Sequence, residues 1–213
     1  MSTGPETVGP SSDGTVSGAA LVVVGALLVH WTIRAFVLND TGPTRVSDEL
    51  LGAWTAEYEG QSWPSLLACR VQYGVRPFAG HALLRAGFAF LGPAVEASRV
   101  VGLVATSVLI AAGGVAATLG HGASAGRFVS ILLATTPTIV ACSIAPDPTL
   151  FAATSLMIAW ALAKIATRSR GVVSSLALFG AGVAVGSTCL FRWEALMVLP
   201  FAVVGFLGTA TQS

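Results

Sequence analysis

Long apolar stretches constrain this chain more than any other feature of its sequence. Six of them are found: Gly18 to Leu38, Val100 to Leu119, Phe128 to Ile144, Thr149 to Ala166, Val172 to Leu190 and Ala195 to Leu207. A helix needs about 20 mostly apolar residues to cross a bilayer, and hydrocarbon leaves helices and closed barrels as the only spanning structures. The sequence therefore predicts an all-α fold, a polytopic transmembrane helix bundle of about six spans.

The composition points to the same class of protein. Only 10% of the residues are charged and 54% are hydrophobic, whereas a soluble domain carries roughly a quarter charged residues. The formal net charge of +1 gives no basic field, so nucleic acid is not an expected partner. The three cysteines form no CxxC pair, and His81 and His121 have no neighbouring ligands at metal spacing. We therefore predict no metal site, and no cofactor is indicated.

The apolar stretches divide the chain into segments. We expect a loop after the first span to carry interfacial helices at Ser47 to Glu57 and at Ala79 to Leu91. The first stretch lacks the basic start and the small-residue cleavage site of a signal peptide, so a span is favoured over a cleaved signal. The predicted divisions are a disordered tail at 1–17, the first span at 18–38, the loop at 39–98, a bundle of further spans at 99–209 and a tail at 210–213.

Basic residues in the short connections predict the orientation. Arg127 follows the second apolar stretch, and Lys164, Arg168 and Arg170 follow the fourth, whereas the turn at Asp147 contains an acid and no base. Short basic loops stay in the cytosol. We therefore expect a cytosolic N-terminus, with the loop at 39–98 and the Asp147 turn on the lumenal or extracellular side.

The loop at 39–98 holds the densest group of candidate functional residues. Asp48 and Glu49 could supply a general base, or they could stabilise the first turn of a helix capped by Ser47. Aromatic and basic residues follow them in a definite order: Trp54, Tyr58, Gly60 and Trp63, then Tyr73-Gly74-Val75-Arg76-Pro77-Phe78.

This order resembles the first lumenal loop of the GT-C glycosyltransferases, and it is most similar to the mannosyltransferases that build dolichol-linked oligosaccharides and GPI anchors. That family carries an Asp-Glu pair after the first span, then a Tyr-Gly and a Trp, then an Arg with Ser or Pro before an apolar helix. Pro137 in the third apolar stretch and the segment Phe191-Arg192-Trp193-Glu194 extend the resemblance. Because the family's enzymes have more spans, the chain looks like the N-terminal half of one.

The resemblance implies a reaction and roles for several residues. The donor would be a polyprenyl or dolichyl phosphate sugar as co-substrate, and the acceptor a lipid-linked glycan or a GPI-type glycolipid. Asp48 would be the general base, with Glu49 assisting it. Arg76 and Arg192 would bind the lipid phosphate, and Trp63 and Tyr73 would contact substrate. From the residues alone, Arg76 could instead pair with a loop acid, and Arg192 could lie along the membrane edge or pair with Glu194.

Three further polar residues are candidates near the outer boundary of the bundle. His30 and Arg34 lie one helical turn apart, and polar groups at membrane depth usually face a bundle interior or a cavity. They could bind the lipid phosphate, although Arg34 is close enough to the interface to extend toward water. Asp147 stands between two prolines, either at the site or as a solvated turn acid.

The sequence leaves other functions and locations open. A transporter subunit would place polar residues near the midplane in broken helices, and a non-catalytic membrane scaffold would need no site at all. The resemblance favours the endoplasmic reticulum membrane, with a bacterial plasma membrane as the alternative.

Overall fold

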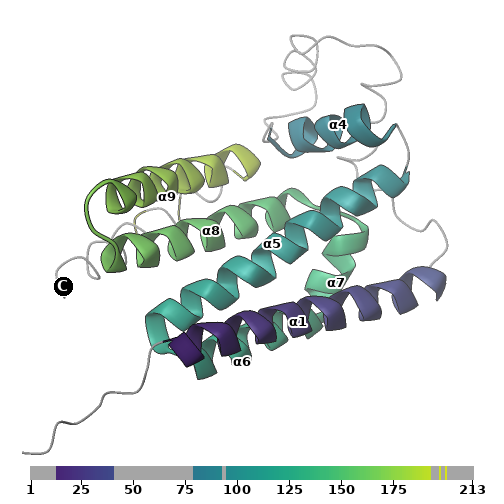
Figure 1. Cartoon of the computed structure of the whole chain (residues 1–213). Coiled ribbons are helices and arrows are strands. Elements are labelled where there is room, and N and C mark those ends of the chain that lie inside the picture. The colour runs from purple at the N-terminus through teal and green to yellow at the C-terminus, as the bar shows by residue number, and fades with distance from the viewer. Residues whose placement is uncertain (1–12, 41–78, 93–94, 193–196, 198–199, 201–213) are drawn as a thin grey trace, which may run out of the picture.

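A computed structural model describes residues 13–40, 79–92 and 95–192, together with residues 197 and 200. Every secondary-structure element that spans several of these residues is an α-helix, which confirms the all-α prediction for this part of the chain (Figure 1). The helices are α1 (Asp13–Asp40), α4 (Ala79–Leu91), α5 (Val95–His121), α6 (Ala123–Thr135), α7 (Pro137–Ile144), α8 (Pro148–Arg168) and α9 (Val172–Phe191).

Three of these helices, α5, α8 and α9, are long and apolar enough to cross a membrane. The bent pair α6–α7 makes a fourth candidate if it forms one span. The apolar part of α1, Ala20–Phe36, is shorter. The predicted sixth span, Ala195 to Leu207, lies outside the described residues except for residues 197 and 200. The described helices therefore support three or four spans, and the predicted six are not established.

The third predicted span is divided. Phe128 to Ile144 was expected to be one helix, but α6 and α7 meet at an angle of 55°. The break falls at Thr136, whose backbone is extended, and Pro137 follows it. Proline lacks the N–H that a continuous helix requires, and its ring clashes with the carbonyl four residues earlier. The proline therefore ends one helix and begins the next.

Other helix ends differ from the predicted boundaries. The helix α1 begins at Asp13, inside the predicted disordered tail at 1–17, and α5 begins at Val95, inside the predicted loop at 39–98. Hydropathy marks only the part of a helix that lies in hydrocarbon, and once a helix has formed, adding residues at its ends is inexpensive. The helix predicted at Ala79 to Leu91 is present with those bounds as α4.

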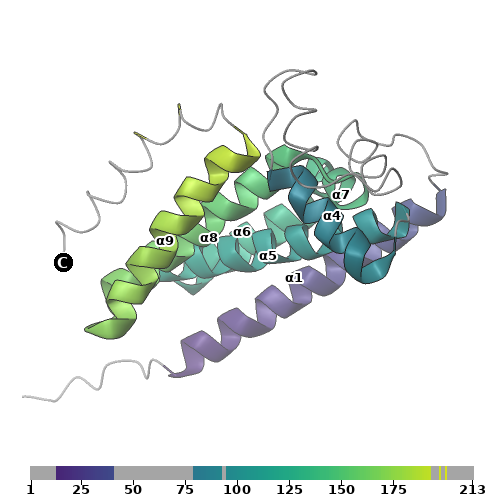
Figure 2. The same cartoon turned by 90° about the horizontal axis from the view of Figure 1, so that it is seen from above.

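The long helices pack side by side, with α5 in the centre (Figures 1 and 2). It contacts α1 and α6 on one side and α8 on the other, and α9 packs along α8. Small residues allow close approach: a Cβ on Gly102 of α5 would lie 2.6 Å from the carbonyl oxygen of Ser143 in α7. Helices in membranes associate through such close backbone contacts.

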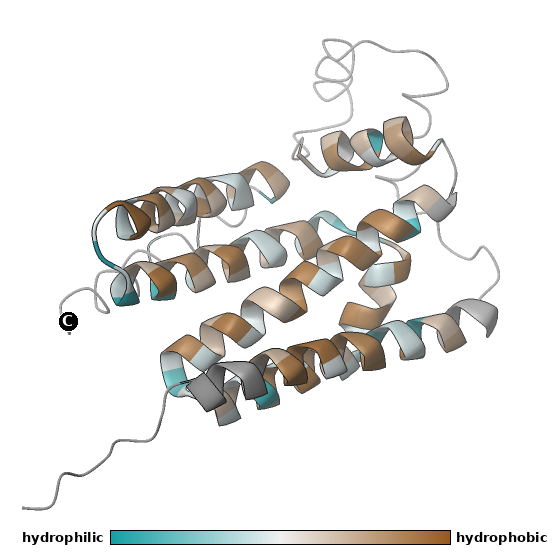
Figure 3. Ribbon diagram, in the orientation of Figure 1, coloured by the Kyte–Doolittle hydropathy of each residue, from teal (hydrophilic) through white to brown (hydrophobic). Residues whose placement is uncertain are grey.

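Apolar side chains cover much of the outside of the bundle. Figure 3 shows hydrophobic residues along the lengths of the helices and several hydrophilic ones near their ends. The outermost helix, α9, exposes an extensive apolar surface that includes Val172, Val173, Leu176, Leu178, Phe179 and Val183. A surface of this kind suits contact with lipid, as expected for a membrane protein.

Candidate functional site

Several helix ends meet at one end of the bundle. The connection from α7 to α8 and the end of α9 are joined there by a side-chain contact, and α4 packs against α5, α8 and α9. The end of α1 is linked to the start of α5 at the same end (Figure 1). Segment 41–78 leaves α1 after Asp40 and joins α4 at Ala79, so both of its attachment points belong to these helices.

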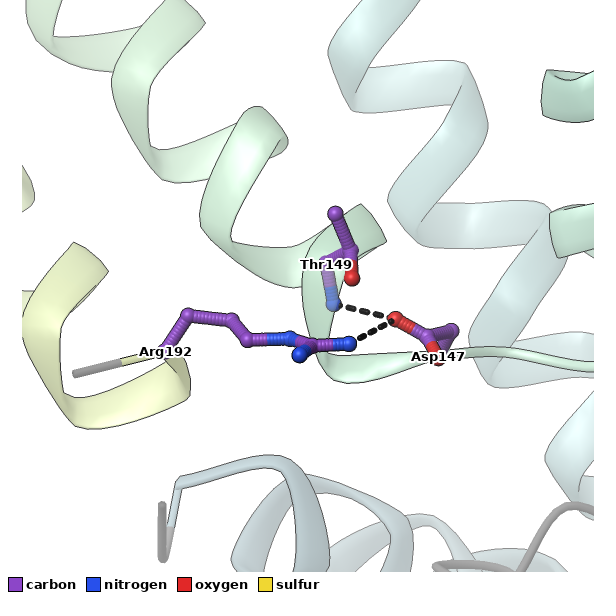
Figure 4. Close-up of polar contacts among 3 residues, drawn as sticks. All are labelled: Asp147, Thr149 and Arg192. Carbon is purple, nitrogen blue, oxygen red and sulfur yellow. Dashed lines mark hydrogen bonds and ion pairs between the residues drawn. The ribbon is translucent and has the colours of Figure 1, made fainter. Parts of the chain in front are cut away.

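Asp147 and Arg192 form an ion pair at this end. The Nη2 atom of Arg192 lies 3.4 Å from Oδ1 of Asp147, and the same oxygen accepts a hydrogen bond of 2.6 Å from the backbone N–H of Thr149 (Figure 4). Asp147 is the N-cap of α8, with Pro148 in the first turn, and Arg192 is the C-cap of α9. The pair therefore ties the start of one helix to the end of its neighbour.

Apolar contact supports this pair from the bundle side. The rings of Phe151 and Phe191 lie with their centroids 5.6 Å apart, one turn into α8 and at the end of α9. The Asp147 and Arg192 side chains themselves remain 38% and 39% exposed. A partly exposed guanidinium oriented by a carboxylate can reach an anion at the membrane boundary.

The carboxyl group of Asp147 is held in its ionised form. Burial alone would raise its pKa. The hydrogen bonds from Thr149 and the neighbouring Arg192 guanidinium lower the pKa by more than burial raises it, so the pKa lies below its ordinary value. At neutral pH Asp147 is thus a carboxylate that accepts hydrogen bonds. It is suited to orienting Arg192 and unsuited to donating a proton.

His30 lies in the interior of the bundle. Its side chain is fully buried, with Nδ1 at 3.1 Å from the carbonyl oxygen of Ala134 in α6 and Nε2 at 3.1 Å from Oγ1 of Thr106 in α5. Ala134 is in the last turn of α6, where carbonyls lack partners within the helix. Because a carbonyl can only accept, Nδ1 carries a proton. His30 therefore joins three helices, and both ring nitrogens already bond to the protein.

Arg34, one turn further along α1, reaches the start of α5. Its Nη2 donates a hydrogen bond of 2.7 Å to the backbone carbonyl of Arg99. Trp31 makes a second link between the two helices through Nε1 and Oγ of Ser107, at 3.0 Å. The predicted common face of His30 and Arg34 is therefore the face of α1 that meets the bundle, with Arg34 at its boundary.

The remaining predicted site residues, Asp48, Glu49, Trp63, Tyr73 and Arg76, lie outside the described residues. Within the described part of the chain, no group of three or more His, Cys, Asp or Glu side chains could hold a metal ion. Sequence reasoning missed Arg99, because only the approach of α1 brings Arg34 to this residue, which directly precedes the apolar stretch predicted from Val100. Its position at a span boundary was the available signal.

Comparison with known proteins finds no matching family model, no similar curated protein and no similar solved structure.

Proposed function

We propose that this protein is a membrane glycosyltransferase of the GT-C type that transfers a sugar, mannose by resemblance, from a polyprenyl phosphate donor to a lipid-linked glycan or GPI-type acceptor. The observation that supports the proposal is the Asp147–Arg192 pair at one end of the bundle. The loop that carries Asp48 and Glu49 is attached to the helices of that same end, between Asp40 and Ala79.

The proposed reaction requires a base and a group that neutralises phosphate. Asp48 removes the proton of the acceptor hydroxyl as its oxygen bonds to the anomeric carbon, and Glu49 assists. The bond between that carbon and the phosphate oxygen breaks, so negative charge collects on the leaving lipid phosphate. Arg192 and Arg76 stabilise this charge, because a guanidinium fork matches phosphate oxygens.

Other residues support this site. Asp147 keeps the guanidinium of Arg192 in place, and Trp63 and Tyr73 contact substrate. His30 is better suited to holding α1 in the bundle than to binding phosphate, since both ring nitrogens are engaged by Thr106 and Ala134. We propose the endoplasmic reticulum membrane, with the N-terminus in the cytosol, as the location.

A transfer assay tests the proposal. Membranes that contain the full chain are given radiolabelled polyprenyl-phosphate-mannose and a glycolipid acceptor, and the labelled product is extracted. We expect transfer to fall about 100-fold or more in Asp48→Asn, since a general base contributes about 10²–10⁴ in rate. Asp13→Asn, at the opposite end of α1, is the matched control and should retain full transfer.

Two results would overturn the proposal. Full transfer by Asp48→Asn would show that the base is assigned wrongly. If no polyprenyl phosphate sugar is used by the wild-type chain, the enzyme class itself is wrong.

A transporter subunit is the second candidate, and the broken pair α6–α7 favours it. Transporters place substrates at discontinuous helices, and α6 and α7 meet at 55° beside Pro137. In proteoliposomes, solute uptake that disappears in Pro137→Ala while sugar transfer is absent would support this candidate. Sugar transfer without uptake would exclude it.

A further inference from the structure

Two arginines meet where the end of α1 reaches the start of α5. Arg34 donates to the backbone carbonyl of Arg99, with a nitrogen–oxygen distance of 2.7 Å. This bond holds the two side chains near enough for the charge of Arg99 to repel that of Arg34. Within the described residues neither side chain forms an ion pair, whereas Arg192 pairs with Asp147. Two like charges held together without a carboxylate favour the binding of an anion.

Hydrogen-bond donors without a partner are found at this contact between Arg34 and Arg99. The Nε atoms of Arg34 and Arg99 are both buried and have no hydrogen-bond partner. Buried donors in proteins are nearly always paired, and an unpaired donor on a charged group is especially costly. An oxyanion beside both guanidinium groups would accept from both Nε atoms and would offset their repulsion.

The surroundings indicate that the anion belongs to a lipid. Exposed apolar side chains flank the two arginines on both helices: Trp31 and Phe36 on α1, and Val100 and Val104 on α5. Free phosphate would leave these side chains uncovered, whereas lipid chains would cover them. Arg168 offers a contrast at the opposite end of the bundle. It also donates to a backbone carbonyl of α5, that of Leu119, but its side chain is exposed.

We infer that Arg34 and Arg99 bind the phosphate group of an anionic membrane lipid, whose chains lie against the apolar surface of α1 and α5. The lipid joins these helices at the membrane boundary. The site needs only a membrane setting and does not depend on sugar transfer. The phosphate is that of a bulk phospholipid or of a polyprenyl phosphate, which present the same oxygens to the arginines.

Lipid binding to the purified full chain tests the inference. The protein is titrated with phosphatidylglycerol, with polyprenyl phosphate or with phosphatidylcholine, and bound lipid is counted by native mass spectrometry. We expect both anionic lipids to bind more tightly than phosphatidylcholine. Arg34→Gln and Arg99→Gln should each raise the dissociation constant of an anionic lipid about tenfold, the scale of one charge-assisted hydrogen bond. Arg168→Gln is the matched control and should leave it unchanged.

Lysine variants cover the case in which a glutamine variant does not fold. Arg34→Lys and Arg99→Lys keep the charge but lose the fork of donors, so their dissociation constants should lie between those of the wild type and the glutamine variants. Tighter binding of polyprenyl phosphate than of phosphatidylglycerol identifies the polyprenyl lipid as the occupant, and the reverse order identifies a bulk phospholipid.

Three outcomes overturn the inference: equal affinity for phosphatidylcholine, unchanged affinity in the variants of Arg34 and Arg99, or an equal loss in Arg168→Gln. The last would mean that anionic lipid is attracted by surface charge alone. Because the titration contains no sugar donor or acceptor, a failed transfer assay leaves this result unaffected.

Discussion

His30 shows, at the scale of the single residue, how this bundle accommodates a polar side chain at membrane depth. The sequence predicted that the side chain could face the bundle interior, because polar groups seldom face lipid. It could not predict the partner, because Ala134 is 104 residues away in the chain. The carbonyl of Ala134 becomes an acceptor only because α6 ends just before Pro137.

Replacing His30 with alanine should destabilise the folded protein. The change removes two buried hydrogen bonds and leaves the carbonyl of Ala134 without its donor, so we expect a loss of about 1–3 kcal/mol. Thermal unfolding in detergent micelles measures it. Trp31→Phe is the control, since its bond to Ser107 is exposed, and it should cost less than about 1 kcal/mol. Equal stability of His30→Ala and the wild type would contradict the three-helix contact.

Asp147 should make stability depend on pH. Its pKa is lower in the folded protein than the value of about 3.9 in an unfolded chain, so its stabilising effect is present above pH 4 or so and is lost as the pH falls through the folded pKa. Asp147→Asn keeps an N-cap but loses the charge, and should cost less than about 1 kcal/mol at neutral pH because the pair is partly exposed to solvent.

Unfolding curves of the wild type and Asp147→Asn across the pH range check this effect. The difference in unfolding temperature should shrink on acidification. A difference that stays constant down to about pH 3 would show that the charge of Asp147 does not stabilise the fold.

The sequence predicted Asp147 and Arg192 as separate candidates on the same side of the membrane, but it did not predict that they pair. Asp147 stood out because prolines flank it, and Arg192 because it follows an apolar stretch. Their contact depends on the packing of α9 along α8, which no local pattern contains. Arg99 was missed for the same reason, because only the approach of α1 brings Arg34 to it.

At the scale of the helix, apolar stretches predicted the existence of elements better than their ends or their continuity. The predicted span Val172 to Leu190 corresponds closely to α9, which ends at Phe191. The stretch Phe128 to Ile144 looked equally continuous, because a single proline changes mean hydropathy little. Pro137 nevertheless breaks the helix, because the break depends on a missing N–H and not on polarity.

Glycines at helix crossings give a prediction at this scale. Gly102→Ala places a Cβ 2.6 Å from the carbonyl oxygen of Ser143, so α5 and α7 must separate, at a cost of about 1–3 kcal/mol. At Gly182 of α9 a Cβ meets nothing within 4 Å. Gly182→Ala should therefore stabilise the protein by about 0.5–1 kcal/mol, through the higher helix propensity of alanine. Thermal unfolding of both variants in the same detergent compares them, and a stabilising Gly102→Ala would contradict the close crossing.

At the scale of the whole molecule, arginines stand at both ends of the bundle. One end of the bundle has Arg127 in α6, Arg168 at the end of α8 and Arg170 just after it, and the other end has Arg34, Arg99 and Arg192. The short-loop rule counts the first group, although Arg168 also donates to the backbone carbonyl of Leu119. In the second group, Arg34 and Arg192 have partners within the bundle, and we infer a lipid partner for Arg34 and Arg99. Because arginines lie at both ends, the orientation stays a prediction from the short-loop rule.

Chemical labelling of the two ends tests both the crossing and its direction. In a chain whose natural cysteines are replaced by serine, single cysteines are introduced at exposed positions: Ser124 at the start of α6, Arg170 after α8 and Thr149 at the start of α8. A maleimide that cannot cross membranes is added to sealed vesicles of known orientation. If the bundle spans the bilayer, cysteines at 124 and 170 react from one side and the cysteine at 149 reacts from the other.

A fourth position, Val183, provides the control within the same experiment. It is exposed in the middle of α9, so a cysteine there should resist the aqueous maleimide in intact vesicles and react after detergent is added. The start of α1 lies at the same end of the bundle as the connection from α5 to α6. If the cysteines at positions 124 and 170 react from the cytosolic side, the predicted cytosolic N-terminus is therefore established. Labelling of the cysteines at positions 149 and 170 from the same side would exclude α8 as a membrane-spanning helix, because these positions lie at its two ends. If the cysteine at position 183 reacts with the maleimide in intact vesicles, the apolar face of α9 is not covered by lipid.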